Sequence, residues 1–164
     1  LGERGAQFRG IGFNTAYQNS NMITRSGNIL EQIDEMVERK RQVLINTMLR
    51  VGEECINNAR TLGTYTDQTG NLRSSIGYAL YVDGERIFVS DLKKVKDGDL
   101  GVRNAEAKIK SITIDHPHSI ILVVVAGMKY AIHVELKGYN VLTSAQLTGR
   151  ELAPRLLRQL GFKI

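Results

Sequence analysis

Hydrophobic side chains recur every three or four positions along residues 28–62, which is the spacing of one face of an α-helix. The series comprises Ile29, Ile33, Met36, Val37, Leu44, Met48, Val51, Cys55, Ala59 and Leu62. Asn28 followed by Glu31 predicts an N-terminal capping box, and Gly63 predicts the end of the helix. About 34 residues span roughly 50 Å at about 1.5 Å per residue, which exceeds the diameter of a small domain. The pattern therefore predicts one long helix that either extends beyond its own core or kinks near Gly52.

Two further segments carry the hydrophobic patterns of β-hairpins. Residues 76–82 place their larger apolar side chains on one face, and Asp83-Gly84 is a turn signal that leads to a returning strand over 86–90. Residues 120–126 form an unbroken run of leucine, alanine and β-branched residues, which we expect at the centre of the sheet. Apolar residues alternate through 129–136, and this alternation predicts a strand that pairs with residues 120–126 as a second hairpin.

The C-terminal residues 143–160 have a helical pattern. Its apolar side consists of Leu147, Leu152, Leu156 and Leu160. Thr143 or Ser144 offers an N-cap, and Gly161 predicts the end. Because proline lacks a backbone donor and crowds the preceding turn, Pro154 predicts either a bend or the first turn of a second helix.

Two segments lack a regular pattern. Residues 1–27 are rich in Gly, Asn, Ser, Gln and Thr, so we expect a flexible N-terminal arm that either orders on a partner or stays disordered. Residues 91–118 predict a mobile loop with a short helix within 102–112. The predicted fold class is α+β, with a long N-terminal helix packed on an antiparallel sheet of two hairpins and a C-terminal helix, in a single domain over residues 28–164.

Composition narrows the class of protein. The chain has 164 residues, enough for one domain with its own core. Its single cysteine, Cys55, excludes an intrachain disulfide framework and fits a reducing cytoplasm; its place on the apolar side of the helix predicts a buried thiol. No apolar run approaches the roughly 20 residues that a membrane helix needs, so we expect no contact with a membrane.

Positive charge gathers toward the C-terminus. The net charge is +5, and residues 119–164 contain six Lys or Arg against two Glu. Two interpretations stay open for this basic C-terminal segment. It is either a solvated helix face or a surface for non-specific contact with a DNA backbone.

The sequence contains no group of catalytic or metal-binding residue types that the predicted elements bring to one place. His116, His118 and His133 with Glu135 supply metal-ligand types, but Pro117 makes chelation by the first two rings awkward. Residues 97–99 do not begin a calcium loop, because position 12 of such a loop is a lysine here, and residues 70–75 lack the signature of a phosphate loop. We expect no catalytic residues, no metal, no cofactor and no enzyme activity.

Three short motifs occur in a distinctive order. Residues 69–76 read T-G-N-L-R-S-S-I, residues 129–135 read K-Y-A-I-H-V-E, and residues 137–144 read K-G-Y-N-V-L-T-S before the last helix. This order resembles the tail-completion, or minor tail component, family of long-tailed bacteriophages and prophages. The chain departs from the commoner form by Lys137 between Leu136 and Gly138, and by its loop at 91–118.

The resemblance implies an α+β structural protein of the virion neck or tail. Such a subunit acts in tail completion or head-tail joining, assembles into a ring that favours six copies, contacts other neck or tail proteins and is assembled in the bacterial cytoplasm. The motif residues to which the resemblance gives a role in fold and subunit geometry are Gly70, Leu72, Arg73, Ser75, Ile76, Tyr130, Ala131, Glu135, Gly138 and Tyr139.

The long helix itself predicts a subunit interface. Ile29, Ile33, Met36 and Val37 lie on its N-terminal half, where the remaining sequence offers no obvious partner. Uncovered apolar surface generally marks an interface. A structural ring subunit is therefore the first hypothesis, and a nucleic-acid-binding module that uses the basic C-terminal segment is the alternative.

Overall fold

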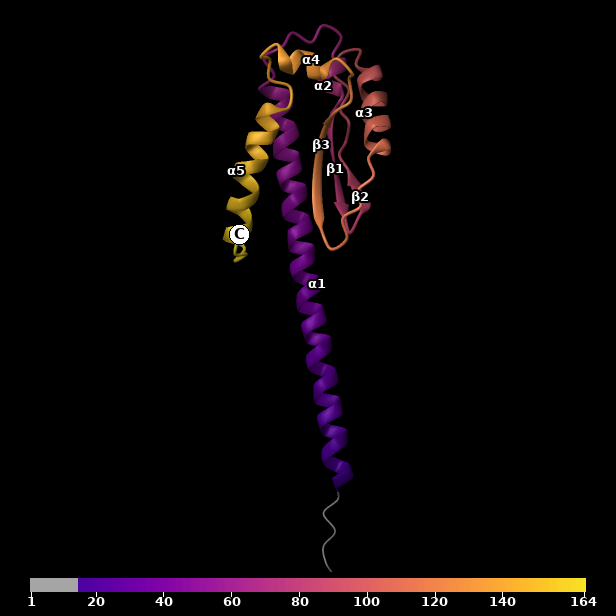
Figure 1. Cartoon of the computed structure of the whole chain (residues 1–164), viewed down its shortest axis with the longest axis vertical. Helices are drawn as coiled ribbons and strands as arrows, with labels where there is room; N and C mark the ends of the chain where they lie inside the picture. The colour runs from indigo at the N-terminus through magenta and orange to yellow at the C-terminus, as the bar shows by residue number, and fades with distance from the viewer. Residues whose placement is uncertain (1–14) are drawn as a thin grey trace, which may run out of the picture. The chain divides into compact units, whose positions relative to one another are not determined.

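The computed structural model describes the backbone of residues 15–164 and the side chains of residues 27–164 (Figure 1). The elements are α1 (Thr15–Thr61), α2 (Asn71–Ser74), β1 (Ile76–Val82), β2 (Glu85–Val89), α3 (Asp99–Ser111), β3 (Ile120–Ala126), α4 (Ala131–Leu136) and α5 (Thr143–Gln159). The chain divides into two units, residues 1–41 and 42–164. No helix in the described part of the chain has both the length and the apolar composition required to cross a bilayer.

The sheet has three antiparallel strands in the order β2-β1-β3. The hairpin of β1 and β2 forms at the predicted turn, where Asp83 and Gly84 both have positive φ. All seven residues of β1 are buried, so β1 is the central strand, whereas every residue of β2 is exposed. The prediction that residues 120–126 occupy the centre is wrong, because within residues 15–164 β3 pairs with β1 alone and lies at an edge.

Helices cover both faces of the sheet within residues 42–164 (Figure 1). On one face, Ile76 and Tyr78 of β1 pack against the C-terminal part of α1 and against α5. The helix residues of this cluster are Val51, Cys55, Ile56, Ala59, Ala145 and Leu152. On the other face, Ala79 and Tyr81 pack against Ile109 of α3. This arrangement of helices on a three-stranded antiparallel sheet confirms the α+β class.

Gly52 allows α1 to lie close to the sheet. A Cβ at this position would be 2.5 Å from a ring carbon of Tyr78, which is closer than carbon atoms approach each other. The Tyr78 hydroxyl lies 3.0 Å from Glu53 Oε1 and donates a hydrogen bond to it. Gly52 therefore serves packing, and α1 continues through it as one helix that ends two residues before Gly63.

The second predicted hairpin is wrong. Residues 131–136 form the short helix α4, and the free edge of β3 has no neighbouring strand in the described chain. The reason is tertiary packing: Ala131 is buried with Leu72 and Val141, and Val134 packs beside them. Positions three apart share a helix face, whereas they lie on opposite faces of a strand.

The N-terminal helix begins earlier than predicted. α1 starts at Thr15, so Asn28 and Glu31 lie inside the helix and do not form its cap. The segment between Thr15 and Gly27 is mainly polar, and its few apolar residues do not show the apolar period on which the prediction depended. The predicted flexible arm falls partly on residues 1–14, which lie outside the described residues.

The two later helices correspond to predicted ones. α3 contains the predicted short helix and begins three residues earlier than position 102. α5 runs as one helix through Pro154, so the alternative of two separate helices is wrong. Leu152 is buried as predicted, whereas Leu147 and Leu160 are exposed, which corrects two of the four positions assigned to the apolar side. Gly161 follows the helix end with a φ of 83°.

Candidate interaction groove and the motif residues

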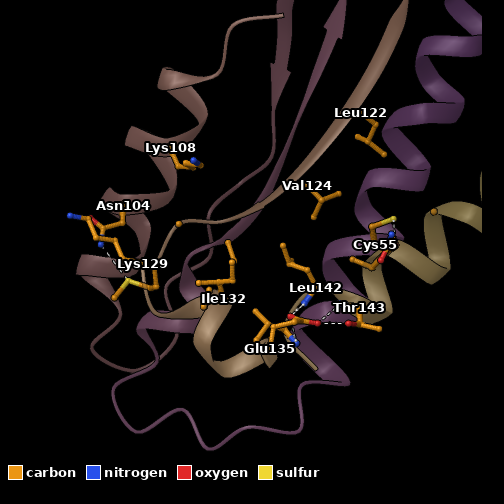
Figure 2. A pocket seen from close by; sticks show the side chains of 18 of the residues that line it. Cys55, Asn104, Lys108, Leu122, Val124, Lys129, Ile132, Glu135, Leu142 and Thr143 are labelled. Atoms are coloured by element: carbon orange, nitrogen blue, oxygen red, sulfur yellow. Dashed lines mark hydrogen bonds between the residues drawn. The ribbon is translucent and has the colours of Figure 1, made fainter. Parts of the chain in front are cut away.

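A cavity of about 1100 Å³ lies within residues 42–164, beside the free edge of β3. Side chains of α1, α3, β3, α4 and α5 line it. Figure 2 shows Leu122 and Val124 of β3 between Lys108 of α3 on one side and Cys55 of α1 on the other. We refer to this cavity as the β3 groove.

Apolar side chains form the floor of the β3 groove. Leu122, Val124 and Ala126 come from β3, and Met128 and Val141 come from the segments that flank α4. They also pack on the buried clusters beneath, so their positions are set by the core. A concave apolar surface fixed by the core is suited to binding a further apolar segment.

The charged side chains at the groove are mainly basic. Lys108 comes from α3, Lys129 precedes α4 and Arg150 lies on α5, and all three are exposed. Glu135 is the only acidic side chain among the lining residues. Because three cations face this one carboxylate, the lining carries a net positive charge.

Glu135 caps the N-terminus of α5. Its Oε2 accepts hydrogen bonds from the backbone N–H of Val141 at 3.0 Å and of Leu142 at 2.9 Å. Its Oε1 accepts from the N–H of Thr143 at 3.1 Å and from the Thr143 hydroxyl. These donors would otherwise be unsatisfied, and the negative charge lies at the positive end of the helix dipole. Asn140 adds a second cap through Oδ1, which accepts from the Ser144 N–H at 3.0 Å.

The predicted cap residues Thr143 and Ser144 are wrong, because neither side chain caps α5. Burial opposes ionisation of Glu135, but the hydrogen bonds from Thr143, Leu142 and Val141 outweigh it and lower the pKa of the carboxyl below its usual value. The ionised carboxylate is therefore the form that stabilises the fold.

Glu135→Gln is expected to reduce the free energy of unfolding by about 2 kcal/mol at neutral pH, because it replaces a charged acceptor of several hydrogen bonds. The lowered pKa adds stability that is present above the unfolded-state pKa of about 4.3 and is lost as pH falls through the native value. The difference between wild type and variant should therefore shrink in acid. Urea unfolding at several pH values measures it, with the exposed Glu106→Gln as the matched control. A difference that does not depend on pH would contradict the assigned cap.

The first motif builds a tight corner between α2 and the segment before α3. Gly70 has a φ of 78°, and a Cβ on it would lie 1.9 Å from the carbonyl oxygen of Val95. Ser74 Oγ accepts a hydrogen bond from the Val95 N–H at 2.8 Å, and Asn71 Oδ1 accepts from the Gly101 N–H at 3.0 Å. Gly70 is therefore required both by its backbone conformation and by the close approach of another chain segment.

Arg73 stabilises the same corner. The backbone N–H of Arg73 donates a hydrogen bond to Asp67 Oδ2 at 2.8 Å. The guanidinium carbon of Arg73 lies 5.6 Å from the centre of the Tyr65 ring, within the range of a cation–π contact. Burial raises the pKa of Tyr65 to about 12, although the Arg73 cation favours the phenolate. Tyr65 therefore stays neutral and serves as a packing surface for Arg73.

The first two motifs meet in space. The Ser75 carbonyl accepts from the Gly127 N–H at 2.9 Å, and Ser75 Oγ accepts from the Met128 N–H at 3.4 Å. Leu72 and Ala131 share one buried cluster. These contacts link α2 to the end of β3 and to α4, so the motif residues in this group act on the fold of a single subunit.

The other motif residues occupy different places. Ile76 is fully buried in the cluster that β1 forms with α1 and α5, while Tyr130 and Tyr139 are exposed. Gly138 ends α4 with a φ of 86°, and its N–H donates to the Glu135 carbonyl at 2.9 Å. Gly138 thus acts as a left-handed helix terminus. The structure gives the motif residues folding contacts and does not gather them into one ligand site.

The predicted interface residues of α1 lie in the first unit and are exposed. Ile29, Ile33, Met36 and Val37 are 48–60% exposed, and their neighbour Leu30 is exposed to the same extent. At about 100° per residue, these five side chains fall on one side of the helix. We refer to this set as the α1 stripe.

The remaining candidates give no metal or thiol site. His116, His118 and His133 are exposed, and no group of three or more His, Cys, Asp or Glu side chains within the described residues is placed to hold a metal ion. Cys55 is buried, as predicted, and burial together with Glu54 raises the pKa of its thiol. A neutral thiol that donates to the Ala145 carbonyl at 3.3 Å is a packing group.

Sequence reasoning did not find the β3 groove. Its lining residues come from five elements, and the incorrect hairpin placed residues 129–136 against the edge of β3 that is in fact open. One signal was available: Gly138 follows a segment of helix formers, which is typical of a helix that ends in a left-handed glycine.

Comparisons of the chain with models of protein families, with curated proteins and with solved structures give no match.

Proposed function

We propose that this chain is a structural subunit of the neck or tail of a tailed bacteriophage, where it joins other copies of itself in a ring. The observation that carries the proposal is the α1 stripe, a continuous apolar face on a helix whose residues from 27 to 40 are all exposed. Burying one large aliphatic side chain contributes about 1.5–3 kcal/mol, so covering the stripe gives several kcal/mol to association.

A head-to-tail contact of the stripe with the next subunit would produce the ring. A face that binds a different patch on the next subunit makes a head-to-tail contact, and such contacts close into rings when the rotation between subunits permits. The order of motifs at 69–76, 129–135 and 137–144 supports the virion setting, a ring of six and a role in tail completion or head-tail joining. The neighbouring partners are then other neck and tail proteins.

The experiment is a search for the chain in purified particles. Phage particles produced by the bacterium that carries the gene are purified on density gradients, and quantitative mass spectrometry measures their proteins. The chain is expected at about six copies per particle, because a closed ring fixes its stoichiometry. Absence from tailed particles contradicts the proposal. Retention on cellular DNA that salt reverses steeply would instead favour the basic C-terminal segment as a nucleic-acid-binding surface.

A further inference from the structure

β3 exposes one full edge of backbone groups to the groove. The hydrogen bonds from the Asp83 N–H to the Ser119 carbonyl and from the Gly127 N–H to the Ser75 carbonyl mark both ends of the ladder with β1. In an antiparallel pair, every second residue of a strand bonds to the same neighbour. Residues 121, 123 and 125 therefore bond to β1, while the N–H and C=O groups of residues 120, 122, 124 and 126 point outward.

The sequence of this edge strand lacks the charged residues and prolines that protect many edge strands. β3 consists of seven apolar residues with no charge and no proline. The opposite edge strand β2 is shorter and begins with Glu85 and Arg86. An apolar strand with free backbone groups is a template for pairing with a further strand. In the described part of the chain, only β3 combines such an edge with a groove lined by helices.

The charge of the groove selects the partner. Lys108 lies on α3 and Arg150 on α5, the helices on opposite sides of the sheet in Figure 1, and Lys129 follows the end of β3 by three residues. These three cations outnumber the single acidic lining residue, Glu135, whose carboxylate accepts hydrogen bonds at the start of α5. An extended segment with an apolar centre and acidic residues at its ends matches both the floor and the rim.

We propose that the β3 groove binds an extended, acidic-flanked segment of a partner protein, which adds to the sheet as a fourth strand beside β3. The backbone of the segment pairs with the outward groups of Leu122 and Val124, its apolar side chains cover the groove floor, and its carboxylates contact Lys108, Lys129 and Arg150. The residues of this surface are different from those of the α1 stripe. Binding of a partner segment here would be a function in addition to self-association.

The test uses the full chain and a fluorescein-labelled decapeptide that alternates valine and threonine between two aspartates at each end. Fluorescence polarisation is expected to give a Kd on the order of 10 µM. The same peptide with every central amide N-methylated cannot form the strand ladder and should bind at least about tenfold more weakly. No binding up to about 1 mM, or equal binding of the methylated peptide, overturns the proposal.

Two variants locate the site. Val124→Pro removes an outward N–H without removing a bond to β1, so it should weaken binding at least about tenfold. Lys108→Glu with Arg150→Glu should weaken binding about tenfold at low salt, whereas the matched pair Lys110→Glu with Arg155→Glu, on the same helices but outside the groove, should change it less than about twofold. Equal effects of the two pairs contradict the assigned rim.

Amide hydrogen exchange of the wild-type complex keeps the proposal testable should Val124→Pro fail to fold. Saturating decapeptide is expected to slow exchange at Leu122 and Val124 at least about tenfold. Exchange at Ile121 and Val123 should change little, because these amides already bond to β1. Slowing at the second pair without the first would contradict strand addition.

Discussion

Ile33→Asp combined with Val37→Asp is expected to weaken self-association of the full chain at least about 100-fold. Each wild-type side chain contributes apolar area to the α1 stripe, and each aspartate would place a carboxylate in the contact. Sedimentation velocity from about 10 to 500 µM measures the change, and wild type is expected to pass from monomers or small oligomers to larger assemblies over this range.

The isolated subunit should keep its helical content, because Ile33 and Val37 are 48% and 60% exposed. The matched control is Asn28→Asp with Gln42→Asp, which adds the same charge on the opposite side of the helix, given about 100° per residue. We expect the control to associate like wild type. Unfolding of the monomer by the first pair, or equal association of both pairs, would contradict the interface.

The second large effect is expected at Gly70. Gly70→Ala should reduce the free energy of unfolding by about 3 kcal/mol or more, because a Cβ has to displace the carbonyl of Val95 and also disfavours the positive φ. Urea unfolding followed by circular dichroism measures the loss. The corner that joins α2 to the segment before α3 is the part that this change would open.

Gly138→Ala separates the two causes. Gly138 has a similar φ of 86°, but an added Cβ meets no atom within 4 Å. We expect a loss of about 1 kcal/mol from the backbone conformation alone. The difference between the free energies of unfolding that the two variants lose then gives the cost of the clash between a Cβ at position 70 and the Val95 carbonyl. Equal losses at both positions would show that the contact with Val95 contributes nothing.

Helical and strand periods predicted much of the fold. The C-terminal part of α1 and α5 each carry an apolar face that reaches the core, and the hairpin of β1 and β2 is marked by its Asp83-Gly84 turn, so these elements were visible in the sequence. The segment from Thr15 to Gly27 was missed because its sequence is mainly polar and its few apolar residues show no clear helical period.

The error at α4 has a different physical cause. Alternating apolar residues across 129–136 fit a strand. The six residues of α4 are too few for their apolar pattern to distinguish a helix from a strand. The helix buries Ala131 and leaves Leu136 78% exposed, so the apolar residues of the segment are not all core residues. Tertiary contacts with Leu72 and the cap that Glu135 provides for α5 decide the outcome.

Of the candidate sites, one could be predicted from the sequence and one could not. The exposed α1 stripe was predictable, because Ile29, Ile33, Met36 and Val37 lie along one helix and no other segment offered a matching partner. The resemblance gave the motif residues a role in fold and subunit geometry; Gly70, Arg73 and Glu135 make contacts within the subunit, and the part in subunit geometry stays a prediction. The β3 groove was not predictable, because it depends on an edge that becomes visible only once the strand order is known.

The most direct test of the account is photo-crosslinking from the α1 stripe. p-Benzoylphenylalanine is incorporated in place of Ile33 in the full chain, and the irradiated protein is analysed by denaturing electrophoresis and mass spectrometry. A ladder of covalent oligomers is expected from this position, and only monomer when the probe replaces Asn28 on the opposite side of the helix. Products that join position 33 only to residues of its own subunit would contradict the claim that the stripe is a contact between subunits.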